Sequence, residues 1–176
     1  MTVLLYILGG IIALILILAV LAPKTYNVNR SIEIGKPKAT VFEYLKYLKN
    51  QADWSPWEKK DPKMHKEFRG TDGKVGAVSY WKGNKDVGEG EQEITKIVPG
   101  ERIESELRFL KPWKSTSDAY LVVDGLDKEN TRVTWGFSGK NKFPMRIMVF
   151  FMNMDKAVGK DFEEGLASLK SRMESS

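Results

Sequence analysis

The sequence predicts an α+β fold in which a curved antiparallel sheet wraps around a long C-terminal helix, preceded by one apolar helix. Three observations lead to this prediction. Residues 3–22 contain no charged side chain, residues 65–138 form short alternating segments separated by turn residues, and the apolar residues after Pro144 recur at helical spacing. A sheet with one dry face needs a cover, and a long amphipathic helix can provide it.

The N-terminal segment prefers a different solvent from the rest of the chain. All 28 basic and 23 acidic residues lie beyond Ala22, so the mean hydropathy of −0.34 averages two unlike parts. Twenty apolar residues at about 1.5 Å each would span about 30 Å of hydrocarbon. A signal peptide would need basic residues ahead of a shorter run, and a buried helix is seldom apolar all round. We therefore expect a transmembrane anchor at residues 1–23 and one domain at residues 24–176.

Basic residues directly after the predicted anchor indicate its orientation. Lys24, Arg30, Lys36 and Lys38 follow the span, whereas only the α-amino group precedes it. Since basic flanks tend to stay inside, we expect a single-pass membrane protein whose C-terminal domain is cytoplasmic.

Composition excludes several kinds of site. The chain has no cysteine, and His65 is its single histidine. Disulfide scaffolds, thiol nucleophiles, iron–sulfur clusters, cysteine-based zinc sites and His-pair metal sites are thereby excluded. Carboxylate sites for Mg²⁺ or Ca²⁺ stay open, but no EF-hand or P-loop pattern occurs, so we expect no metal and no cofactor. The net charge of +5 comes from bases interleaved with acids, so we expect no nucleic-acid partner.

The predicted domain begins with a strand and a helix. Residues 26–34 alternate between polar and apolar, and Pro37 is well placed in the first turn of the helix predicted over residues 37–48. Residues 50–62 are rich in turn formers and predict a short helix or an ordered loop.

Six strands and a long helix complete the predicted domain. The strands are expected at residues 65–69, 75–82, 87–98, 102–109, 115–124 and 131–138, each bounded by turn residues. After Pro144 the apolar residues are separated by one, three or four positions as far as Met173, which predicts one helix with a single apolar face.

Several short strings resemble those of a known family. This order of elements is similar to the START/Bet v 1-like (SRPBCC) superfamily with its helix-grip fold, and the strings resemble its polyketide cyclase/dehydrase-like branch. The strings lie at residues 54–57, 61–62, 73–77, 81–84, 87–90, 99–103, 111–112, 133–135 and 161–166. The resemblance covers about residues 26–174. It implies a cavity between sheet and helix, but the family includes cyclases, lipid carriers and chaperone co-activators, so it does not settle the chemistry.

Strand alternation gives a candidate binding face. Because side chains alternate, the inward positions can be grouped as Ile103, Leu107 and Phe109; Val133, Trp135 and Phe137; Ala119, Leu121 and Val123; and Val75, Ala77, Ser79 and Trp81. Met145, Met148, Met152, Phe150 and Phe151 are expected across from them. These residues predict either a pocket for an apolar ligand or a packed core without a cavity. The candidate ligand contacts are Trp57, Trp81, Gln92, Phe109, Trp113, Trp135, Phe137, Met148 and Met152.

Other conspicuous residues have structural interpretations. Glu89, Glu91 and Glu93 alternate like the charged residues of the next strand, which favours cross-strand pairs on a wet face over paired catalytic carboxylates. Gln92 has the opposite parity and could orient a ligand. His65 is expected to be exposed.

Two tryptophan regions leave alternatives open. The Trp54/Trp57 pair is expected to close one end of the sheet rather than stack on a substrate. Trp113 could gate a cavity or cap the core.

Three functions are compatible with these features. A membrane-anchored protein that binds a hydrophobic small molecule or lipid fits best. A cyclase or dehydratase acting on a polyketide-like substrate would need an inward acid or base, for which the sequence offers only Gln92 and Ser79. A protein–protein adaptor or stress-response co-factor is the third. Binding is therefore favoured over catalysis.

Overall fold

The computed structural model describes residues 2–140 and 154–175. In chain order, the elements are α1 (Thr2–Leu21), β1 (Thr25–Ile34), α2 (Lys38–Leu45), the 3₁₀ helix η1 (Leu48–Asp53), α3 (Pro56–Lys60), β2 (His65–Arg69), β3 (Val78–Lys82), β4 (Glu89–Val98), β5 (Arg102–Lys111), β6 (Ser115–Gly125), β7 (Thr131–Lys140) and α5 (Met154–Glu174).

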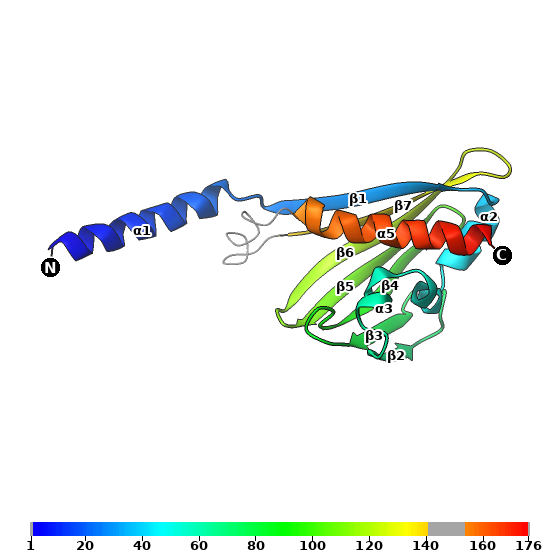
Figure 1. The fold of residues 1–176 in the computed structure, drawn as a ribbon, viewed down its shortest axis with the longest axis horizontal. Helices are drawn as coiled ribbons and strands as arrows, with labels where there is room; N and C mark the ends of the chain where they lie inside the picture. Colours follow the sequence, from blue (N-terminus) through cyan, green and yellow to red (C-terminus); the bar gives the residue numbers. More distant parts are fainter. Residues whose placement is uncertain (1, 141–153, 176) are drawn as a thin grey trace.

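The described strands form one antiparallel sheet of seven strands. Its order is β1-β7-β6-β5-β4-β3-β2, so every neighbouring pair except β1 and β7 is also consecutive in the chain. Figure 1 shows the strands curving beneath α5, which runs alongside β1. This arrangement confirms the predicted α+β fold, a curved antiparallel sheet with a long C-terminal helix.

Helix α5 covers the sheet with a narrow apolar stripe. Phe162, Leu166, Leu169 and Met173 are all buried, at the three- and four-residue spacing of one helix face. They meet β-strand residues such as Val123 and Val133, which are fully buried in the same core. The described part of α5 confirms the predicted helix as far as Met173. The predicted helical residues Ile147, Phe150 and Phe151 lie outside the described part.

The start of β3 differs from the expectation. The strand was expected from Val75, but β3 begins at Val78, and Val75 is 61% exposed instead of facing α5. The reason is a turn: Gly73 and Gly76 have φ values of +78° and +86°, which extended strands do not have. Ala77 keeps its predicted inward place and is buried.

Helix α1 lies apart from the sheet, extending away from the start of β1 (Figure 1). A helix needs about 20 consecutive apolar residues to cross a bilayer. Judged on the described residues, no helix is both long enough and apolar enough to do so. This finding overturns the predicted transmembrane anchor and, with it, the predicted single-pass membrane location with a cytoplasmic domain.

Candidate ligand-binding site

Pairing between strands places the alternating residues on two faces, an inner face toward α5 and an outer face. Ile103 on β5 lies opposite Leu121 on β6, which lies opposite Trp135 on β7. Ala119 lies opposite Phe137 in the same way. The predicted grouping of inward residues on these three strands is therefore confirmed by their register.

One end of the inner face carries a tryptophan that packs over a glycine. Trp81 is the cross-strand partner of Gly90, and Gly90 is the partner of Phe109. A Cβ atom on Gly90 would lie 2.6 Å from Cζ2 of Trp81, so only glycine leaves room for the indole here. The Trp81 and Phe109 rings meet edge to face with centroids 6.1 Å apart.

A second aromatic group connects the sheet to α3 and α5. Trp135 stacks on Phe162 of α5, with centroids 4.2 Å apart and planes at 13°. Trp57 of α3 meets the Trp135 ring edge to face at 5.5 Å, and Trp54 does so at 4.9 Å. Gly165 permits this approach, since a Cβ there would lie 2.8 Å from Cζ3 of Trp135.

Burial differs between the two ends of the inner face. Toward α2, the side chains of Ile34, Val123 and Val133 are completely shielded from solvent. Toward the start of α5, Trp81 and Phe109 are only half-buried. Large apolar side chains are normally buried in a closed core, so this second region, which we call the open end, exposes apolar surface on the face that should be dry.

Polar side chains interrupt the apolar inner face near the open end. The Nε2 atom of Gln92 donates a hydrogen bond to Oγ of Ser105 over 3.2 Å. The hydroxyls of Tyr26 and Ser117 are 2.7 Å apart and share a hydrogen bond. Burial raises the pKa of Tyr26 above its ordinary value, so its phenol is neutral at pH 7.

One ion pair lies at the edge of this region. Lys66 of β2 is the cross-strand partner of Trp81, and its ammonium group pairs with the carboxylate of Glu58 on α3. Burial lowers the pKa of Lys66. The pair links the sheet edge to α3 beside the aromatic rings.

The structure brings several predicted contact residues together and separates others. Trp57, Trp81, Gln92, Phe109, Trp135 and Phe137 lie on or against the inner face, as their register and ring contacts show. Trp113 lies in the β5–β6 loop and is 64% exposed, so it does not cap the core. Met148 and Met152, like Met145, lie outside the described residues.

The other conspicuous residues can also be placed. Trp54 is buried in the same core cluster as Leu48 of η1 and Leu166 of α5. His65 is exposed and contacts Glu67 of the same strand, as expected.

The contact between Tyr26 and Ser117 was not predicted from the sequence. The two residues are 91 positions apart, and their contact depends on β7, which lies between their strands. A signal did exist at Gly139, the cross-strand neighbour of both residues, because a glycine at an inward position leaves space for a ring.

The three alternating glutamates of β4 belong to the outer face. Arg108 donates hydrogen bonds to Glu91, Glu93 and Glu106 over 2.6–2.7 Å. This arrangement confirms cross-strand charge pairs on a wet face. None of the described strand residues that face inward is an Asp, Glu or His.

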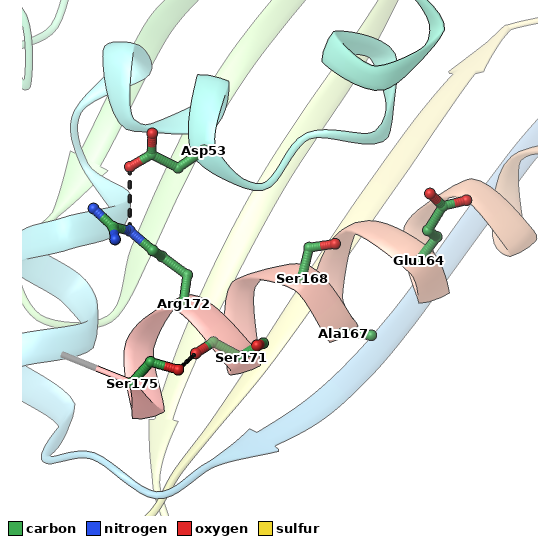
Figure 2. A pocket seen from close by; sticks show the side chains of 7 residues that line it. All are labelled: Asp53, Glu164, Ala167, Ser168, Ser171, Arg172 and Ser175. Atoms are coloured by element: carbon green, nitrogen blue, oxygen red, sulfur yellow. Dashed lines mark hydrogen bonds and ion pairs between the residues drawn. The ribbon is translucent and has the colours of Figure 1, made fainter.

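A hydrophilic groove lies elsewhere, between η1 and α5. Figure 2 shows Asp53 facing Arg172 across it, where their Oδ2 and Nε atoms are 3.4 Å apart. The groove is lined by Asp53, Glu164, Ala167, Ser168, Ser171, Arg172 and Ser175. It contains none of the predicted contact residues and no aromatic ring, so it does not correspond to the predicted pocket.

Metal-ligating side chains do not gather in the described parts of the chain. No group of three or more His, Asp or Glu residues within residues 2–140 and 154–175 is arranged to hold a metal ion.

Several solved structures have the same fold. The Aha1 dimer from Colwellia psychrerythraea is 16% identical, with a TM-score of 0.59 over 85% of this chain and 96% of that one. A structure from Thermobifida fusca is 19% identical, with a TM-score of 0.62 over 84% and 92%. Ara h 8.0201 is 11% identical, with a TM-score of 0.56 over 86% and 99%. At these identities the similarity concerns the fold alone, and it confirms the Bet v 1-like helix-grip arrangement.

Sequence comparison places the chain more specifically. No curated protein matches it. The family described as polyketide cyclase / dehydrase and lipid transport matches residues 25–174, which span every described strand and α5. The chain therefore belongs to the polyketide cyclase / dehydrase and lipid transport family, as its short strings predicted.

Proposed function

We propose that this protein binds a hydrophobic small molecule or lipid between the open end of the inner face and α5. The observation that carries the proposal is the half-burial of Trp81 and Phe109 on a face whose other end is fully closed. Apolar surface that stays accessible on a concave face is typical of ligand sites. Membership of the family supports it, since that family suggests hydrophobic ligands.

The proposed contacts follow from the geometry. Trp81, Phe109 and Trp135 would supply flat apolar surface, with Trp57 and Phe137 beside them. Gln92 would supply a polar group among them, and the exposed Trp113 lies at the tip of the hairpin that continues from Phe109.

No observation of similar weight supports the enzymatic alternative. General acid–base catalysis needs a titratable group within reach of the substrate. The described strands present Tyr26, Arg30 and Lys66 on the inner side. Each already has a partner: Ser117 for Tyr26, Asp155 and Glu163 for Arg30, and Glu58 for Lys66.

Isothermal titration of the full chain with biphenyl and with palmitate tests the proposal. We expect saturable binding of at least one probe, weakened about tenfold or more in Trp81→Ala, because a large buried aromatic surface is lost. Tyr120→Ala is the matched control, since Tyr120 lies on the outer face over Gly136. If neither probe binds, or if the two variants weaken binding equally, the proposed site is wrong.

A further inference from the structure

A row of inner-face residues, most of them polar, runs across the sheet from β3 to the edge strand β1. Its members are consecutive cross-strand partners: Ser79, Gln92, Leu107, Ser117, Gly139 and Tyr26. The next row toward the open end contains Trp81, Gly90 and Phe109. The polar row therefore lies directly beside the aromatic surface of the proposed site.

The first polar position is formed by Gln92 with Ser105. One end of the Gln92 amide is hydrogen-bonded to Ser105, and the other end has no hydrogen-bond partner within residues 2–140 and 154–175. An amide offers two donor hydrogens and one acceptor oxygen, so either orientation leaves a polar group available. The hydroxyl of Ser79 lies on the neighbouring strand at the same level.

The second polar position is formed by Tyr26 with Ser117. Two hydroxyls joined by one hydrogen bond keep one further hydrogen to donate and several lone pairs to accept. Tyr26 reaches Ser117 across Gly139, because a Cβ atom on Gly139 would collide with the Tyr26 hydroxyl.

An apolar residue separates the two polar positions. Leu107 is the cross-strand partner of Gln92 on one side and of Ser117 on the other. Neighbouring strands are about 4.8 Å apart, so the backbones at Gln92 and Ser117, two strands apart, are about 10 Å apart across the sheet. The inner face thus presents polar, apolar and polar surface in sequence.

From this arrangement we infer that the ligand is an apolar molecule with an oxygen function at each end, about 10 Å apart. The inference rests on the proposed function. A ligand oxygen at each position satisfies polar groups that a hydrocarbon of the same shape would leave buried without partners, which costs free energy. A single-headed acyl chain satisfies only one position.

Three probes that differ only in hydroxyl number test this inference on the full chain. They are biphenyl, 4-hydroxybiphenyl and 4,4′-dihydroxybiphenyl. The two oxygens of 4,4′-dihydroxybiphenyl have a separation comparable to the distance of about 10 Å between the two polar positions. We expect affinity to rise about fivefold with each hydroxyl, as one net hydrogen bond per step predicts.

Variants assign each step to one polar position. In Gln92→Leu, and separately in the double variant Tyr26→Phe with Ser117→Ala, one of the two fivefold steps should disappear. Ser31→Ala is the matched control, because Ser31 shares its hydroxyl hydrogen bond with Thr134 and both are on the outer face. Both steps should persist in that variant.

The outcomes separate this inference from the proposed function. If none of the three probes binds but palmitate does, the proposed function stands and the two-ended ligand is wrong; if palmitate fails to bind as well, the proposed function is wrong. If the three bind with equal affinity, binding stands and the two-ended ligand is wrong. The series measured on the unaltered chain decides between these outcomes even if a variant fails to fold.

Discussion

At the scale of single residues, glycines in α5 set how closely the helix approaches the sheet. Gly165 leaves the space that Trp135 and Pro56 occupy, with a hypothetical Cβ only 2.8 and 3.0 Å from their ring atoms. Gly159 leaves space only for the guanidinium of Arg30, the flexible end of a long side chain. The absence of a side chain is therefore required by rigid neighbours at Gly165, whereas at Gly159 the neighbour is flexible.

The two glycines should respond differently to alanine. An alanine raises helix propensity by about 1 kcal/mol, while overpacking against rigid rings costs about 1–3 kcal/mol. We expect Gly165→Ala to lower the free energy of unfolding by about 1–2 kcal/mol in urea denaturation. Gly159→Ala should change it by less than about 0.5 kcal/mol, because Arg30 can move and the gain in helix propensity is offset by weaker ion pairs of Arg30 with Asp155 and Glu163. Equal effects would show that Trp135 does not hold α5 in place.

At the scale of elements, β4 and β5 are joined on the outer face by charges as well as by backbone hydrogen bonds. Arg108 of β5 bonds to carboxylates of both strands, and Arg69 of β2 also pairs with Glu91. Hydrogen bonding by Arg108 holds the pKa of Glu91 below its ordinary value of 4.5. A carboxylate whose pKa is lower in the folded state stabilises the fold above its unfolded pKa, and this contribution is lost as pH falls.

Replacing Arg108 should therefore have a pH-dependent effect. We expect Arg108→Met to lower the free energy of unfolding at pH 7 by about 1 kcal/mol, since partly exposed ion pairs contribute modestly. The difference should shrink as pH falls below 4.5, because the stabilising contribution of the Glu91 carboxylate is lost there. Lys85→Met serves as the control, because Lys85 has no ion pair among the described residues. A difference that is the same at pH 7 and pH 3 would contradict this account.

Much of this element-level description was predictable from the sequence. Alternation along β5, β6 and β7 identified the inward residues because successive side chains of a strand point to opposite faces. The start of β3 was not predictable, since it depends on the positive φ of Gly76. The Tyr26–Ser117 contact was not predictable either, because it requires the sheet order that brings β1 beside β7.

At the scale of the whole molecule, the closed end and the open end of the inner face have separate roles. Leu169 and Val123 are fully buried at the closed end, where they stabilise the fold. Trp81 and Phe109 at the open end retain exposed surface. Stability and binding should therefore be separable by mutation.

Two alanine variants test this separation. Leu169→Ala should lower the free energy of unfolding by about 2–5 kcal/mol, because it creates a cavity in the closed core. Its affinity for biphenyl should stay within about twofold of the original protein, a change smaller than one hydrogen bond. Trp81→Ala should lose affinity with a smaller loss of stability. Urea denaturation and calorimetry of both variants would show whether these losses instead occur together.

The position of α5 beside β1 also affects the exposed edge of the sheet. Strand β1 is an edge strand, and an edge with unpaired carbonyls invites strands from other chains. Here Arg30 donates to the carbonyl of Asn29, and Lys170 of α5 donates to the carbonyl of Glu33 over 2.6 Å. At the other edge, β2 is five residues long and mostly charged. The helix that closes the core therefore also hinders the β1 edge from pairing with strands of other chains.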